Sequence, residues 1–123
     1  MSHFDTLSNG TLALEVAKKQ GWEFTWNGAV GGLIVSHAGD MKGIWLDKKL
    51  SATFPPIETV DNALALFGAN DPKPTITPCT MPGDVSGWNV TLDVGFSSYQ
   101  RNVEDGKLPR AIVLVWLEWK SDQ

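Results

Sequence analysis

Residues 107–120 read KLPRAIVLVWLEWK and decide the fold class of this chain. Pro109 suits the first turn of a helix, because its ring fixes φ and its missing N–H would have no helical partner there. Eight of the ten residues from Ala111 to Lys120 are apolar, so we expect a buried C-terminal element. The run IVLV at 112–115 is also typical of a buried strand, but the spacing of Ile112, Val115 and Trp119 favours a helix.

The chain has 123 residues, which suffice for one hydrophobic core, and we expect a single domain over residues 1–123. The content of 42% hydrophobic and 20% charged residues excludes general disorder. The net charge is −4, and no cluster of Lys or Arg is larger than a pair. A nucleic-acid partner is therefore not expected.

Cys79 is the one cysteine, which excludes an intrachain disulfide and fits a reducing compartment. The first residues show no charged segment followed by an apolar run, so secretion is not indicated. No apolar run approaches the roughly 20 residues of a membrane helix. We therefore expect a cytoplasmic protein with no membrane partner.

Two further helices are predicted from the spacing of apolar residues. The first covers about residues 11–20 and ends at Gly21, which suits the left-handed position after a helix. The second follows an apolar stripe through residues 57–67, is capped by Thr59 or Asp61 and ends at Gly68.

Alternating polar and apolar residues predict strands at 22–26 and, most clearly, 88–96, and the short apolar runs at 33–35 and 44–46 predict two further strands. Asn27-Gly28 is a hairpin-turn dipeptide, and turns are predicted at 37–43 and 101–106. Residues 69–87 hold four prolines, so we expect a long loop there, either a lid over a site or a passive connector. Together these elements predict an α+β fold: an antiparallel sheet packed with about three helices, in a single-layer or sandwich arrangement.

Chemical motifs are absent from the sequence: no catalytic set, metal-ligand spacing or phosphate-binding loop is present. We therefore predict no catalytic residue, no metal site and no cofactor. Six tryptophans in one small domain leave two readings, core packing or stacking on a ligand. Arg110 likewise either meets an anion at a helix start or pairs with Asp105 or Glu104. The candidate ligand-binding residues are Trp22, Trp26, Lys42, Trp45, Tyr99, Arg101 and Arg110.

Short motifs at both ends of the chain suggest a family. They are Leu7-Ser8, Leu12, Val16-Ala17 and Gly21, followed by Leu108-Pro109-Arg110-Ala111 at the start of the apolar terminal helix. This pattern resembles the small phage proteins of the phage ABA-sandwich family. The resemblance implies an α/β sandwich and a phage or prophage origin, and it carries no catalytic residues over to this chain.

These observations support two functional hypotheses. The first is a non-enzymatic phage accessory protein that counters bacterial defence by sequestering a small ligand, with a nucleotide signal as the candidate, in the host cytoplasm. Aromatic rings would stack on a base while the cations meet phosphates. The alternative is a protein-interaction module that inhibits a host protein or serves phage assembly. A homo-oligomer is expected, because ligand sites often lie between subunits.

Overall fold

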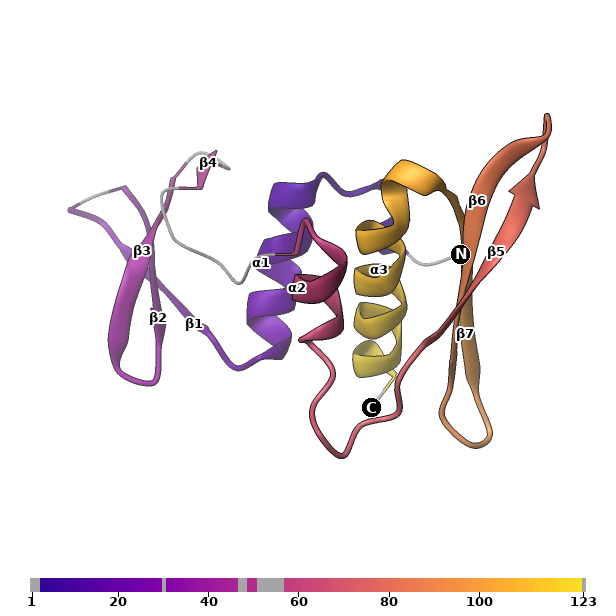
Figure 1. Ribbon diagram of the computed structural model, residues 1–123. Coiled ribbons are helices and arrows are strands. Elements are labelled where there is room, and N and C mark those ends of the chain that lie inside the picture. Colours follow the sequence, from indigo (N-terminus) through magenta and orange to yellow (C-terminus); the bar gives the residue numbers. More distant parts are fainter. Residues whose placement is uncertain (1–2, 30, 47–48, 51–56, 123) are drawn as a thin grey trace. The chain divides into compact units, whose positions relative to one another are not determined.

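The computed structural model describes residues 3–29, 31–46, 49–50 and 57–122. It confirms the α+β class, but the strands divide between two antiparallel sheets where the sequence suggested one (Figure 1). The chain forms two compact units: unit 1 is Met1–Asn9 with Pro56–Gln123, and unit 2 is Gly10–Pro55. Unit 2 is thus inserted in sequence between two segments of unit 1. The expectation of a single domain over 1–123 stays a prediction.

Unit 2 contains most of helix α1 and a four-stranded sheet in the order β1-β2-β3-β4. Its elements are α1 (Asn9–Lys19), β1 (Glu23–Asn27), β2 (Gly32–His37), β3 (Asp40–Leu46) and β4 (Lys49–Leu50). The predicted turn at 37–43 is too long, because His37 already pairs with Asp40. The two residues between them, Ala38 and Gly39, both have positive φ, which is the geometry of a two-residue hairpin turn.

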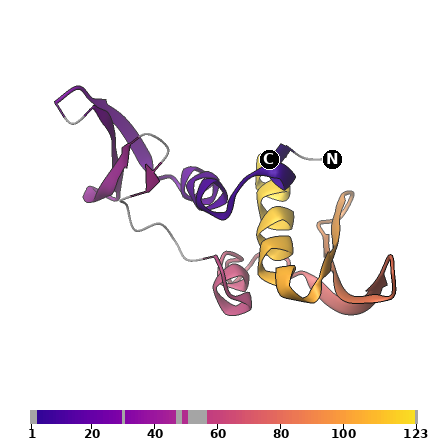
Figure 2. The ribbon, with the colours of Figure 1, turned by 90° about the horizontal axis from the view of Figure 1, so that it is seen from above.

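Unit 1 places helix α3 between helix α2 and a three-stranded sheet in the order β5-β6-β7 (Figures 1 and 2). Its elements are the 3₁₀ helix η1 (His3–Thr6), α2 (Val60–Leu64), β5 (Thr75–Met81), β6 (Val85–Asp93), β7 (Ser98–Glu104), the 3₁₀ helix η2 (Asp105–Lys107) and α3 (Leu108–Ser121). Helix α2 is shorter than predicted, and Thr59 caps it by accepting the N–H of Asn62 at 3.1 Å.

Helix α3 forms the core of unit 1, as the apolar terminal stretch predicts. All residues from Ala111 to Leu117 are buried, and so is Trp119. The ring of Trp119 stacks on Phe67, with 6.3 Å between the ring centroids. On the sheet side, Val90, Leu92 and Tyr99 are buried beneath the helix. Pro109 lies in the first turn, where its missing N–H has no cost.

The prediction of a long loop at 69–87 is wrong, because residues 75–81 and 85–93 pair as the β5–β6 hairpin. The four prolines of this segment disfavour a strand when the sequence is considered alone. Pro78 lies in β5, an edge strand of its sheet, and an edge is where a proline is tolerated within a sheet. Neither the lid nor the passive connector describes this segment.

Two other predictions on this sheet need correction. Residues 101–104, expected in a polar turn, belong to β7, whose alternation of buried Tyr99 with exposed Gln100 is clear only in the structure. Strand β6 ends at Asp93, before the predicted end at Phe96. Gly95 has φ +88° and turns the chain, so Phe96 is fully exposed in the β6–β7 turn.

Candidate functional site

The seven candidate residues divide between the two units. Trp22, Trp26, Lys42 and Trp45 are in unit 2, and Tyr99, Arg101 and Arg110 are in unit 1. Trp45 belongs to β3, but its side chain lies outside the described part of the structure. The two groups are therefore considered separately.

In unit 2 the structure brings Trp22 and Lys42 together and adds His37, which the sequence did not single out. The rings of Trp22 and His37 stack with centroids 5.4 Å apart and an interplanar angle of 12°. Nζ of Lys42 lies 6.0 Å from the Trp22 ring centroid, at the outer limit of a cation–π contact. Trp26 is separate from this group in β1 and is 66% exposed. Trp22, His37 and Lys42 thus form a cluster of mutual contacts within unit 2.

In unit 1, Arg101 has two carboxylate partners. Its Nε and Nη2 atoms donate to the two oxygens of Asp5 at 2.9 and 3.1 Å, and Nη2 also donates to Oε2 of Glu118 at 2.5 Å. Burial lowers the pKa of Arg101, but the hydrogen bonds to Asp5 and Glu118 outweigh it and raise the pKa above its usual value. Arg101 therefore links η1, β7 and α3, which is a structural role.

Tyr99 is also engaged within unit 1. Its hydroxyl donates to Oδ2 of Asp122 at 2.8 Å, at the C-terminal end of α3. This hydrogen bond, together with burial, raises the pKa of Tyr99 above 10.0. The ring is 7% exposed, so its face offers little surface to a ligand.

Arg110 holds the N-terminal segment against the start of α3. It donates to Oδ1 of Asn9 at 2.9 Å and to the main-chain oxygens of Asp5 and Leu7 at 3.1 and 2.5 Å. The predicted alternative, a salt bridge to Asp105 or Glu104, is wrong: the described ion pairs do not include Arg110. Of the seven candidates, Arg110 is the one that lines the pocket described next.

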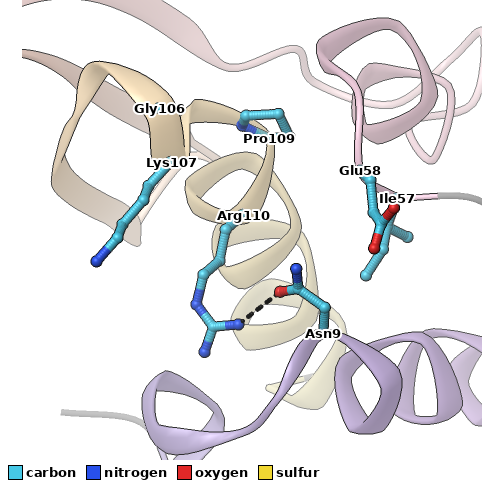
Figure 3. A pocket seen from close by; sticks show the side chains of 7 residues that line it. All are labelled: Asn9, Ile57, Glu58, Gly106, Lys107, Pro109 and Arg110. Carbon is cyan, nitrogen blue, oxygen red and sulfur yellow. Dashed lines mark hydrogen bonds between the residues drawn. The ribbon is translucent and has the colours of Figure 1, made fainter.

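The pocket lies in unit 1 beside the start of α3 and has a volume of about 280 Å³ (Figure 3). We call it the α3 pocket. Its lining combines two cations, a carboxylate, an amide and apolar surface, contributed by Asn9, Ile57, Glu58, Gly106, Lys107, Pro109 and Arg110.

The arrangement of the lining follows from three local structures. Arg110 and Pro109 are in the first turn of α3, and Lys107 immediately precedes it. Asn9 is fixed by its bond with Arg110, and its amide nitrogen points away from that bond (Figure 3). Glu58 lies across the opening from Arg110 (Figure 3).

The lining offers charge and hydrogen bonding rather than a reactive group. It holds one carboxylate and no serine, cysteine or histidine, so no hydroxyl or thiol nucleophile stands beside a base there. Across the described residues, no group of three or more His, Cys, Asp or Glu side chains is placed to hold a metal ion. The described helices also include none that is long and apolar enough to span a membrane.

Sequence reasoning found Arg110 but missed the rest of the α3 pocket. Lys107 could have been identified from the sequence, because it and Arg110 are two cations three residues apart that flank the predicted helix start. Asn9 and Glu58 carried no signal: Asn9 is 101 residues from Arg110 in the chain, and only the fold brings them together.

Comparison with known proteins gives no relative for this chain. No protein-family model matches it, and no curated protein and no solved structure matches it. The resemblance to phage ABA-sandwich proteins therefore stays a prediction.

Proposed function

We propose that this protein binds a small anionic molecule in the α3 pocket and holds it without chemical change. The observation that carries the proposal is the pair of cations, Lys107 and Arg110, in the lining of one cavity of about 280 Å³. In a chain of net charge −4, such a local concentration of positive charge favours an anion.

The start of α3 adds to this positive charge. The first turn of α3 contains no acidic residue, and Lys107 at the N-cap position makes no side-chain capping hydrogen bond. Cations at a helix N-terminus oppose the helix dipole unless an anion is present. An anionic ligand in the α3 pocket would relieve this unfavourable arrangement and also meet the N–H groups of the first turn.

Binding without turnover is supported by the composition of the lining. Ile57 is buried and Pro109 half-buried, so they supply apolar walls, while the polar members are hydrogen-bonding groups. Pockets of mostly fixed shape with a few polar anchors are typical of ligand binding. The lining holds no serine, cysteine or histidine that could act as a nucleophile beside Glu58.

The narrower form of the proposal is a phage or prophage accessory protein that counters bacterial defence by sequestering a nucleotide signal in the host cytoplasm. Its supports are the resemblance at Leu7-Ser8 and at residues 108–111, and the anion-binding character of the α3 pocket. The anti-defence role is tested by expressing the protein in bacteria that carry a defence system: restored plaque formation by defence-sensitive phages supports it, and unchanged plaque formation contradicts it.

Calorimetric titration and thermal unfolding with inorganic phosphate and with nucleoside monophosphates test the proposal. A bound ligand at a hundred times its Kd adds about 2.7 kcal/mol to the free energy of unfolding. Lys107→Ala should weaken binding, whereas Lys19→Ala, which removes an exposed positive charge from α1, should not. Absence of binding by any of these anions contradicts the proposal.

The second candidate function is a protein-interaction module, including a homo-oligomer. It is favoured by Phe96, which is fully exposed at the tip of the β6–β7 turn, and by Trp26 and Met41, which are 66% and 69% exposed. Exposed aromatic residues are common anchors of interfaces. Light scattering on the protein and on Phe96→Ser and Trp26→Ser variants tests this candidate: a monomer at all concentrations contradicts self-association.

A further inference from the structure

We propose that the ligand of the α3 pocket carries two neighbouring N–H donors as well as an anionic group, the combination found in a guanine mononucleotide. This inference rests on the proposed function. It adds the chemistry of the part of the ligand that lies opposite its anionic group. The observation behind it is Glu58, a carboxylate in the lining of a pocket that otherwise favours anions.

Glu58 is held in place by its two neighbours in the chain. Ile57, on one side, is 5% exposed and anchors the segment in the core. Thr59, on the other side, caps α2 through its 3.1 Å hydrogen bond from the N–H of Asn62. The main chain of Glu58 is therefore fixed at the entrance to α2, and a fixed position reduces the entropy lost when a ligand binds.

The charges of the α3 pocket do not neutralise one another. The ion pairs seen among the described residues are Lys18–Glu15, Arg101–Asp5 and Arg101–Glu118, so Glu58 forms none with Lys107 or Arg110. Glu58 and Arg110 thus line the same cavity without pairing (Figure 3). A ligand that is anionic throughout would be repelled by Glu58, whereas a ligand with an anionic end and a donor end satisfies both walls.

A carboxylate is best satisfied by two parallel N–H donors, because it accepts them on its two oxygens. Guanine presents such a pair, N1–H beside the 2-amino group. Adenine presents one donor beside the acceptor N1, which a carboxylate repels. The cavity of about 280 Å³ is slightly smaller than the range of about 300 to 1,000 Å³ that is typical of ligand pockets, so a mononucleotide fits its size better than a dinucleotide. Pro109, which is half-buried, is the apolar surface available to a base in this lining.

The test compares guanosine, inosine and adenosine monophosphates with inorganic phosphate by calorimetric titration. We expect the guanine nucleotide to bind about tenfold more tightly than the adenine nucleotide, the scale of a charge-assisted hydrogen bond. The inosine nucleotide, which lacks the 2-amino group, should lie between them. Inorganic phosphate should bind most weakly.

Glu58→Gln should reduce the preference for guanine to less than about threefold, while affinity for inorganic phosphate stays equal or rises. Glu23→Gln, which changes an exposed glutamate in β1, is the matched control and should preserve the preference. Equal binding of guanine and adenine nucleotides, or a preference that survives Glu58→Gln, overturns this inference and leaves the proposed function standing. Binding of none of the anions overturns both.

Discussion

Arg101 and Asp5 are 96 residues apart in the chain and form a two-pronged ion pair, with N–O distances of 2.9 and 3.1 Å. Asp5 belongs to η1, and Arg101 to β7. The pair therefore ties the segment that precedes the inserted unit 2 to the sheet that follows it. Arg110 reinforces this connection through the main-chain oxygens of Asp5 and Leu7.

Breaking this ion pair should destabilise unit 1. The side chains of Arg101 and Asp5 are 17% and 22% exposed, so water replaces the lost partner only in part. We expect Asp5→Asn to lower the free energy of unfolding by about 1–3 kcal/mol, the cost of leaving a buried hydrogen-bonding group without its partner. Urea unfolding measures the change.

Glu15→Gln is the control for that experiment. It removes the i,i+3 pair of Glu15 with Lys18, at 3.5 Å, in which the Lys18 side chain is 50% exposed, and such pairs on a helix surface contribute about 0–1 kcal/mol. Equal destabilisation by Asp5→Asn and Glu15→Gln would contradict the structural role assigned to Arg101.

Gly87 occupies a position in β6 that has no room for a side chain. A Cβ atom there would lie 2.4 Å from the main-chain oxygen of Val103 and 2.7 Å from Cγ of Met81. Because the obstruction includes main chain, Gly87→Ala should destabilise unit 1 by about 1–3 kcal/mol, the usual cost of overpacking. Thermal unfolding measures this loss.

Gly106→Ala provides the matched control in the same unit, since a Cβ atom at Gly106 meets nothing within 4 Å. This variant should leave the melting temperature unchanged or slightly higher. Equal stability of the Gly87→Ala and Gly106→Ala variants would contradict the close approach of β6 and β7 at Gly87.

The sequence predicted the elements whose signals are local. The helix at the C-terminus follows from Pro109 and the apolar spacing after it, and strands β1, β2 and β3 of unit 2 follow from alternation and from short apolar runs. Strand β5 was missed, because tolerance of Pro78 depends on its place at an edge, which is a property of the sheet and not of the segment. The division into two sheets depends on strand pairing, which no local pattern specifies.

The candidate site shows the same limit. Arg110 was identified because a cation at a helix start is a local signal. Its contacts were predicted incorrectly, since the local acids Asp105 and Glu104 are not its partners and Asn9 is. Likewise Arg101 was proposed for a ligand, although Asp5 and Glu118 already bind it. The partners of long cationic side chains are set by tertiary structure.

Ala38 adopts a conformation that disfavours its side chain. Its φ is 54° in the two-residue turn between β2 and β3, and a left-handed conformation costs a residue with a Cβ atom roughly 1 kcal/mol. We expect Ala38→Gly to stabilise unit 2 by about 0.5–1 kcal/mol. Gly39, with φ 85°, gives the opposite change: Gly39→Ala should be destabilising. Urea unfolding of both variants measures the two signs, and two changes of the same sign contradict this turn geometry.

Tyr99 is the single tyrosine of the chain, so the change in ultraviolet absorbance that accompanies tyrosine ionisation reports on this residue alone. Its hydrogen bond to Asp122 and its burial raise its pKa above 10.0 in the folded protein. Because the folded pKa lies above the unfolded value, the contribution of Tyr99 to stability is complete below pH 10 and is lost as pH rises through the folded pKa. Asp122→Asn should bring the pKa of Tyr99 back toward 10, and Tyr99→Phe should remove this loss of stability at high pH. A titration midpoint that is the same in the wild type and in Asp122→Asn would show that Asp122 does not hold the tyrosine hydroxyl in solution.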